Sequence, residues 1–158
     1  MEAIILISSD NQKIELDSKS AQKSTFLKRL VNEKSKKKEE LQLKDIKYDV
    51  LKKVADYLNY YKNKTPKEIP KPTPSENLYS FLDDWDFEFI NNINLDLTFE
   101  LMNAASELGI QTLLDLASTK VASILKNKSI EDIRKMFKGE CDLSDKELKE
   151  YAELQKQL

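Results

Sequence analysis

The chain has 158 residues, of which 40% are hydrophobic, and its 26 basic and 28 acidic residues give a formal net charge of −2. This size fits one domain with an appendage and is large enough for a hydrophobic core. With no histidine, one cysteine and two glycines, the composition excludes catalytic relays that need imidazole, zinc sites built from several thiolates, intrachain disulfides and glycine-rich loops for nucleotide phosphates.

A β-hairpin is predicted at the start of the chain. Residues Ala3–Ser8 and Lys13–Leu16 have high strand propensity, and the polar residues between them tolerate a turn. The apolar part of the first segment is far shorter than the roughly 20 residues that a membrane span needs, and it follows an acidic residue instead of a basic region. We therefore expect a soluble protein of a reducing compartment.

A helix, a charged loop and a short strand are predicted next. Helical structure is expected to start at Asp17 or Ser18, and apolar residues recur at helical spacing over Ser24–Asn32. The lysine-rich stretch Glu33–Glu40 is interpreted as a solvated loop, because it has little of the arginine and aromatic interleaving that is typical of nucleic-acid sites. Leu41–Leu43 alternate as a short strand would.

An amphipathic helix and a proline-containing break follow. Asp45 is predicted to cap a helix that extends over about Lys47–Lys62. All four prolines fall within 63–84, which we interpret as a linker or long surface loop, because proline excludes regular helix. The predicted helix carries one apolar face, which consists of Val50, Leu51, Val54, Tyr57, Leu58 and Tyr61.

Acidic and aromatic residues alternate over Asp83–Phe89. Trp85, Phe87 and Phe89 are interpreted as anchors that pin the end of the proline loop to the core, and the carboxylates as solvated surface. Paired catalytic carboxylates are the alternative, but that chemistry needs two acids in differing environments and nothing in the stretch distinguishes such a pair. The anchor interpretation is therefore preferred.

The chain from Asp96 onward is predicted to form successive helices. Asp96 is expected to cap a helix that ends at Leu108, where Gly109 can adopt a left-handed conformation. The next helix, predicted over Ile110–Lys126, has an apolar stripe that covers more than half of its circumference. A stripe of this width predicts burial on two sides.

Two further helices are predicted at the C-terminal end. Ser129 and Asp132 form a capping pair for one, and Ser144 with Glu147 forms a capping box for the other. Cys141, between them, is interpreted as a loop or packing residue, because flanking carboxylates raise the pKa of a thiol and disfavour a nucleophile. Strands first and helices afterwards predict an α+β fold.

Several short motifs occur in a particular order along the chain. They are WDxEF at 85–89, FEL at 99–101, LLD at 113–115 and IRKxF at 133–137. In this order and spacing they resemble the S-phase-kinase-associated (Skp) adaptor family of Skp/cullin/F-box ubiquitin ligases, and the similarity extends over nearly the whole chain. The related elongin-type adaptors lack the first motif and the last two helices, so they match less well.

The resemblance implies both a fold and a role. The fold is α+β: a mostly helical BTB/POZ-type α/β domain with a small sheet of short strands over 1–127, which contains the proline loop, and an F-box-binding two-helix extension over 128–158. The role is a non-enzymatic adaptor that bridges F-box substrate receptors to a cullin scaffold, with no catalytic residue, metal or cofactor. We expect it in the cytoplasm and nucleus, with neither nucleic acid nor membrane as a partner.

The resemblance also implies two binding surfaces. Where the family has an Asn-Tyr pair that faces the cullin, this chain has Ser106 and Glu107, and Asn103 is assigned to the same surface. A carboxylate in place of an aromatic interface residue weakens the expectation of cullin binding but not that of the fold. The F-box surface is expected to draw on apolar residues of the last three predicted helices, namely Leu116, Val121, Ile124, Leu125, Ile133, Met136, Phe137, Leu143, Leu148 and Tyr151.

Two non-enzymatic alternatives stay open. The replaced Asn-Tyr pair favours a structural partner of F-box proteins in cullin-free complexes. The other alternative is a BTB-type homo-oligomerisation module, and a weak homodimer in the absence of an F-box protein would be compatible with it. An enzyme is the least favoured class, because the residue types on which catalysis usually depends are scarce.

Overall fold

The computed structural model describes residues 3–33, 40–71, 77, 80–126, 128–137, 149 and 153. The chain divides into two compact units, Met1–Ser123 and Ile124–Leu158. None of the helices in the described ranges is long and apolar enough to cross a membrane.

A three-stranded sheet opens the first unit. Strands β1 (Ala3–Ile7) and β2 (Lys13–Asp17) pair antiparallel, and β3 (Glu40–Gln42) pairs parallel to β1 on its other side. The hairpin turn is tight, with Asn11 in the left-handed region at a φ of 61°. The predicted hairpin and third strand are thereby confirmed. The predicted lysine-rich loop comes directly before β3, and most of it, residues 34–39, lies outside the described residues.

Two helices follow the hairpin. Helix α1 (Ser18–Ala21) is capped by Asp17, whose carboxylate accepts hydrogen bonds from the backbone N–H groups of the next turn. Helix α2 (Thr25–Glu33) confirms the predicted helix at this place. The backbone N–H of Thr25 donates to the carbonyl of Gly109, at 3.2 Å, which ties the start of α2 to a turn more than eighty residues later.

Gly109 is required by that turn for two reasons. Its φ is +64°, and this left-handed conformation is unfavourable in free energy for any residue that has a side chain. A Cβ atom at this position would also lie 1.9 Å from the hydroxyl oxygen of Thr25. The predicted left-handed end of the preceding helix is confirmed, and the tertiary contact makes glycine the only residue that fits without rearrangement.

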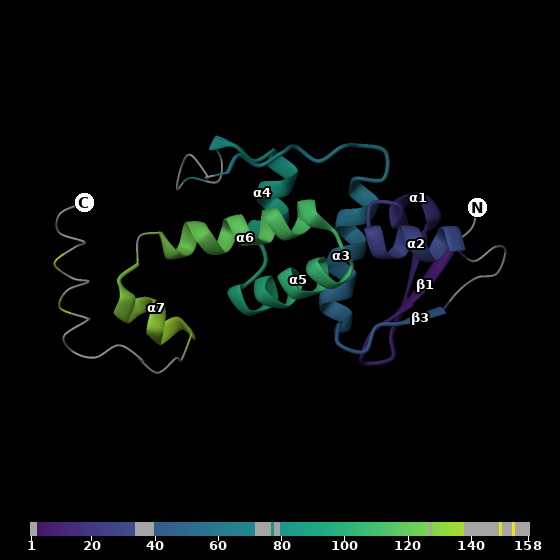
Figure 1. The fold of residues 1–158 in the computed structure, drawn as a ribbon, viewed down its shortest axis with the longest axis horizontal. Coiled ribbons are helices and arrows are strands. Elements are labelled where there is room, and N and C mark those ends of the chain that lie inside the picture. Colours follow the sequence, from purple (N-terminus) through teal and green to yellow (C-terminus); the bar gives the residue numbers. More distant parts are fainter. Residues whose placement is uncertain are drawn as a thin grey trace. The chain divides into compact units, whose positions relative to one another are not determined.

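Helix α3 (Tyr48–Tyr60) lies at the centre of the first unit, and Figure 1 shows it beside the strands and α1. The predicted cap by Asp45 is wrong: Lys47 is the N-cap residue and its side chain makes no capping bond. Instead the backbone N–H of Tyr48 donates to Oδ1 of Asp10 in the hairpin turn, at 2.9 Å. The predicted apolar face is confirmed, since all of its members are buried: Val50, Leu51, Val54, Tyr57, Leu58 and Tyr61.

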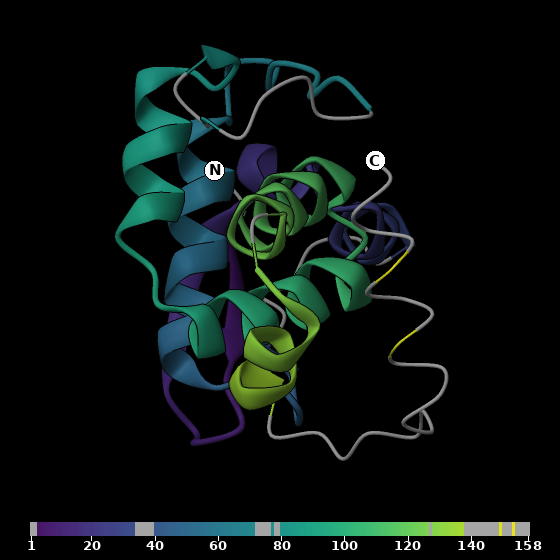
Figure 2. The same ribbon diagram turned by 90° about the vertical axis from the view of Figure 1, so that its left-hand side faces the viewer.

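The acidic aromatic stretch forms helix α4 (Asp84–Asn91), an element that the sequence analysis did not predict. The helix runs alongside α3 (Figure 2), and its aromatic side chains contact those of α3. Phe87 is buried, and Trp85 and Phe89 are half-buried against the core, which confirms them as anchors. The helix was not predicted because prolines precede the segment and because aspartate and aromatic residues, which dominate it, are weak helix formers.

The interpretation of the carboxylates in this stretch as solvated surface is wrong for Asp86. Its side chain is only 5% exposed and accepts a hydrogen bond from the Tyr61 hydroxyl at 2.7 Å. Burial raises the pKa of the Asp86 carboxyl above its usual value, against a lowering by the Tyr61 hydrogen bond. The neighbouring Asp83, Asp84 and Glu88 are exposed, as the sequence analysis expected.

Helices α5 (Leu95–Glu107) and α6 (Gln111–Leu125) complete the first unit, and the last two residues of α6 belong to the second. The predicted cap of α5 by Asp96 is wrong, because Asn94 is the N-cap and its side chain accepts from the backbone N–H of Leu97 at 2.8 Å. Asp96 lies in the first turn, where a negative charge favours the helix dipole.

A buried lysine links α6 to the end of α4. The Lys120 side chain is 8% exposed, and its ammonium nitrogen donates to the carbonyl oxygens of Ile90, at 2.7 Å, and of Ile93. Burial lowers the pKa of Lys120. Because the carbonyl groups at a helix C-terminus lack intrahelical partners, this ammonium satisfies the end of α4.

The second unit contains helix α7 (Ile130–Phe137). The predicted capping pair is confirmed: the backbone N–H of Asp132 donates to the Ser129 hydroxyl at 3.2 Å, and that hydroxyl donates to the Asp132 carboxylate at 2.8 Å. The hydrogen bond from the Ser129 hydroxyl to the carboxylate lowers the pKa of Asp132. The predicted capping box at Ser144 and Glu147, and Cys141, lie outside the described residues.

Candidate protein-binding surfaces

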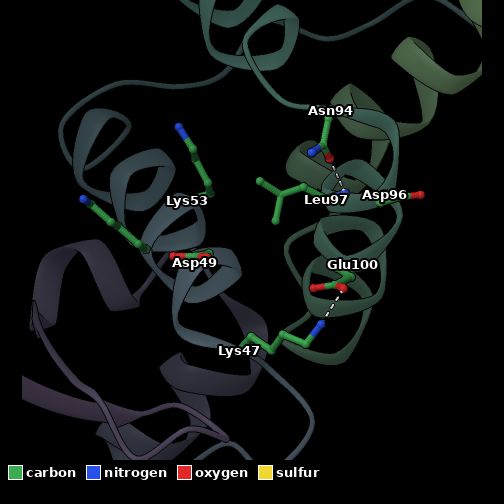
Figure 3. A pocket seen from close by; sticks show the side chains of 8 residues that line it. Lys47, Asp49, Lys53, Asn94, Asp96, Leu97 and Glu100 are labelled. Atoms are coloured by element: carbon green, nitrogen blue, oxygen red, sulfur yellow. Dashed lines mark hydrogen bonds and ion pairs between the residues drawn. The ribbon is translucent and has the colours of Figure 1, made fainter.

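The first candidate surface is a groove between α3 and α5, which Figure 3 shows from close by. It consists of two adjoining depressions of about 480 and 280 Å³ that share Lys47 and Glu100. We call both together the α3–α5 groove. Its lining residues are Lys47, Asp49, Lys52, Lys53, Asn94, Asp96, Leu97 and Glu100 in the first depression, with Asp45, Ile46, Val50, Asn103, Ala104 and Glu107 added in the second.

One ion pair crosses this groove. The ammonium nitrogen of Lys47, at the start of α3, lies 2.8 Å from a carboxylate oxygen of Glu100 on α5, and Figure 3 shows the two side chains extended toward one another. The hydrogen bond that Lys47 donates to Glu100, together with the negative charge of Glu100, raises the pKa of Lys47. Both side chains are exposed, so water screens the pair and it contributes little to stability. A partner protein can therefore break this ion pair and form ion pairs of its own with Lys47 and Glu100.

The structure brings the predicted cullin residues together at this groove. Asn103 and Glu107 line its smaller depression, and Ser106 is exposed on the same helix. Positions three and four apart share one face of a helix, so the three side chains form one surface of α5. Their assignment to a cullin stays a prediction.

The predicted F-box residues fall into four groups, and the fourth, on helix α7, is described separately below. Leu116 and Val121 are 2% and 9% exposed, so these two side chains offer little area to a partner. Ile124 and Leu125, at the end of α6, are half-buried. Leu143, Leu148 and Tyr151 lie outside the described residues. The assignment of all these residues to an F-box stays a prediction.

Helix α7 carries the remaining F-box residues and is the second candidate surface. Ile133 and Met136 are half-buried, Phe137 is 44% exposed, and no residue of the helix is buried. An isolated helix of this length is unstable in water, so its apolar face needs a packing partner. Phe137 is the one large hydrophobic side chain in the described ranges that is exposed to this degree.

Sequence reasoning missed the residues that shape the groove. Lys47 and Glu100 are 53 positions apart. Glu100 belongs to the FEL motif, but this motif indicated only the family, and neither residue was assigned to an interface. Only the packing of α5 on α3 brings them together. Within the described residues no group of histidine, cysteine and acidic side chains could hold a metal ion.

Two family models match the chain. The one described as "Skp1 family, tetramerisation domain", a POZ domain, matches residues 2–63. The one described as "Skp1 family, dimerisation domain" matches residues 111–156. The first covers the sheet and α1 to α3, and the second covers α6, α7 and the C-terminal residues.

Individual relatives align over nearly the full chain. An S-phase kinase-associated protein 1 homolog of Tetrahymena thermophila is 37% identical over 142 residues, which are 90% of this chain and 85% of that protein. The E3 ubiquitin ligase complex SCF subunit sconC of Arthroderma otae is 31% identical over 91% of this chain and 87% of its own length. SKP1-like protein 18 of Arabidopsis thaliana is 30% identical over 93% and 90%.

Proposed function

The chain belongs to the Skp1 family, and on that premise we propose that it is a non-catalytic adaptor subunit of an SCF-type E3 ubiquitin ligase. The adaptor binds an F-box substrate receptor on one surface and a cullin scaffold on another. The observation that carries this proposal is the alignment of 91% of the chain with a relative that is named as an SCF subunit. The cytoplasm and nucleus are the proposed sites of action.

The mechanism of such an adaptor is scaffolding. Holding a substrate receptor and the ligase core in one complex raises the effective concentration of the substrate near the ubiquitin-transfer machinery. The adaptor then needs binding surfaces and no reacting group, which agrees with a composition without histidine and with one cysteine.

The two candidate surfaces fit these two partners. The exposed apolar side chain of Phe137 on α7 suits the apolar core of an F-box interface. The α3–α5 groove suits a cullin, because it combines charged side chains with the exposed Asn103, Ser106 and Glu107. Charged residues at the rim of an interface contribute mainly to specificity and association rate.

One observation favours a second candidate function. Glu107 stands at the position of the aromatic residue of the family's Asn-Tyr pair. It is exposed and lines the same depression as Glu100, so this surface carries two carboxylates. A partner that buries this surface must desolvate that charge. The second candidate is therefore a structural F-box partner that works without a cullin.

Calorimetric titration of the full chain separates the two functions. We expect the full chain to bind an F-box domain, and we expect the complex of the chain with the F-box domain to bind a cullin N-terminal domain. Restoring the family pair with Ser106→Asn and Glu107→Tyr should tighten cullin binding about tenfold, equivalent to about 1.4 kcal/mol. A tyrosine placed on α4 by Asp84→Tyr is the control and should change nothing.

Each result points to one function. Binding of the F-box domain without any cullin binding supports the cullin-free role. Failure to bind either domain overturns both proposals, whereas tightening by the control variant would show that the gain comes from an added aromatic residue and not from its position.

A further inference from the structure

A separate depression lies between α3 and α4. It has a volume of about 350 Å³ and is lined by Lys53 and Asp56 from α3, by Trp85, Glu88 and Phe89 from α4, and by Asn92, the C-cap residue of α4. We call it the α4 depression. Lys53 also lines the α3–α5 groove that is proposed for a cullin, and the other five residues belong to neither the proposed F-box surface nor the proposed cullin surface.

Its aromatic side belongs to a column of stacked rings. The Trp85 ring is nearly parallel to that of Tyr60, with centroids 3.7 Å apart and an angle of 2°, and to that of Phe89, at 5.0 Å and 15°. Trp85 and Phe89 are half-buried, so part of each ring faces the depression. The column therefore presents a fixed π surface at low cost in side-chain entropy, because its rings are already held by stacking.

This column already attracts cations within the protein. The ammonium nitrogen of Lys64 lies 4.1 Å from the ring centroid of Tyr60, and that of Lys53 lies 5.8 Å from the ring centroid of Phe89. Both distances are within the range of cation–π attraction. The aromatic side of the α4 depression thus favours a positive charge.

Two carboxylates complete the depression. Asp56 and Glu88 are exposed, and within the described residues neither side chain has an ion pair or hydrogen bond. Other acidic groups of the first unit do have lysine partners, namely Asp17, Glu40, Asp83, Glu100 and Asp115. With one lysine against two carboxylates, the lining has a net negative charge.

We propose that the α4 depression binds an arginine side chain of a partner protein. A guanidinium group is planar, so it can stack on the exposed part of the Phe89 ring at the end of the column, over which the Lys53 ammonium lies, while its edge donates hydrogen bonds to Asp56 or Glu88. An ammonium group is a compact, strongly hydrated charge and gains less from a flat aromatic surface. An anion is disfavoured by the two carboxylates. Arginine is also enriched in the energetically dominant parts of interfaces.

The proposal is testable because Trp85 is the only tryptophan of the chain. Its indole N–H gives a single resonance in ¹⁵N-labelled full-length protein. We expect acetyl-Gly-Arg-Gly-amide to shift this resonance in a saturable manner with a Kd of roughly 1 mM, which corresponds to about −4 kcal/mol. The same peptide with citrulline, an uncharged isostere of arginine, should not saturate.

Variants assign the effect to the named residues. The double substitution Asp56→Asn and Glu88→Gln keeps the shape of the side chains and should weaken binding at least about fivefold. Lys53→Gln removes the competing charge and should strengthen binding a few-fold. Asp84→Asn is the control, because it removes an exposed carboxylate from the same helix outside the depression, and it should leave the Kd unchanged.

Several results would overturn the proposal. They are a Trp85 resonance that does not respond to the arginine peptide, equal binding of the citrulline peptide or of the same peptide with lysine in place of arginine, and an unchanged Kd for the double variant. An Asp84→Asn effect as large as that of the double variant would show general charge attraction instead of a site. The far-ultraviolet circular dichroism spectrum of every variant should match that of the parent protein. None of these readouts involves an F-box or a cullin, so they are independent of the proposed adaptor function.

Discussion

Replacing Lys120 with methionine tests the role of a buried ammonium group. Methionine keeps most of the length and apolar volume of lysine but cannot donate hydrogen bonds. The change therefore removes the contacts from α6 to the carbonyl oxygens of Ile90 and Ile93 at the end of α4. We expect a loss of stability that is concentrated where α4 ends.

The expected magnitude follows from those two carbonyl groups. A buried acceptor that loses its partner costs about 1–3 kcal/mol. The Ile93 carbonyl loses its hydrogen bond outright, whereas the Ile90 carbonyl keeps a weaker one from the backbone N–H of Ile93, at 3.4 Å. Together they cost about 1–4 kcal/mol, and the methionine variant recovers part of this because no charge is buried any longer. We therefore expect a net loss of about 1–3 kcal/mol in the free energy of unfolding, or roughly 2–12 °C in Tm for a domain of this size.

Urea unfolding at pH 7, followed by Trp85 fluorescence and circular dichroism, measures this loss. Trp85 lies on α4, so its signal reports on the helix that the lysine holds. The control is Lys52→Met, which removes an exposed lysine from α3 and should change stability by less than about 0.5 kcal/mol. A Lys120→Met variant as stable as the parent, or a control that is equally destabilised, would refute the reasoning.

Three further predictions concern single side chains. Gly109→Ala should destabilise the protein by about 2 kcal/mol or more, through the positive φ and the clash with Thr25; a thermal melt in which the additional change Thr25→Ala restores full stability would show that φ plays no part. Because burial raises the pKa of Asp86 above its unfolded value, its contribution to stability is largest at acidic pH and is lost as the pH rises through its folded pKa. Asp86→Asn keeps an acceptor for Tyr61 but cannot ionise, so the parent protein should lose stability relative to this variant as the pH rises above about 4, the ordinary pKa of an aspartate; urea midpoints that differ by a constant amount at every pH would contradict this. Phe137→Ala should weaken F-box binding about tenfold or more without changing the circular dichroism spectrum, since the side chain is 44% exposed; global unfolding of that variant would mean that the residue is part of a core.

The periodic elements could be predicted from the sequence because their pattern records burial directly. Strands β1 and β2 form where the strand propensity of the sequence indicates, and the apolar face of α3 lies in the core as the residue order indicates. The same holds for the positive φ of Gly109 and for the Ser129 cap, because these depend on residue types within one turn of the chain. Local chemistry therefore sufficed for these features.

Helix boundaries and caps were less predictable because the decisive partner is often distant. Asp45 is a reasonable cap by residue type, yet Asp10 of the hairpin turn accepts the hydrogen bond from the backbone of Tyr48. Helix α4 has weak propensity of its own and is stabilised by aromatic contacts with α3. In both cases tertiary contact overrides the local preference.

The sequence by itself determined the α+β class, the apolar faces of the helices and, through the order of its motifs, membership of the Skp1 family. Only the tertiary structure decided which polar groups meet: Lys47 with Glu100 across the groove, Asp86 with Tyr61, and Lys120 with the end of α4. Periodicity reports whether a side chain faces the core, since burial of apolar area is not directional. Hydrogen bonds and ion pairs depend on distances of a few ångströms between residues far apart in the chain, and those distances exist only once the helices have packed.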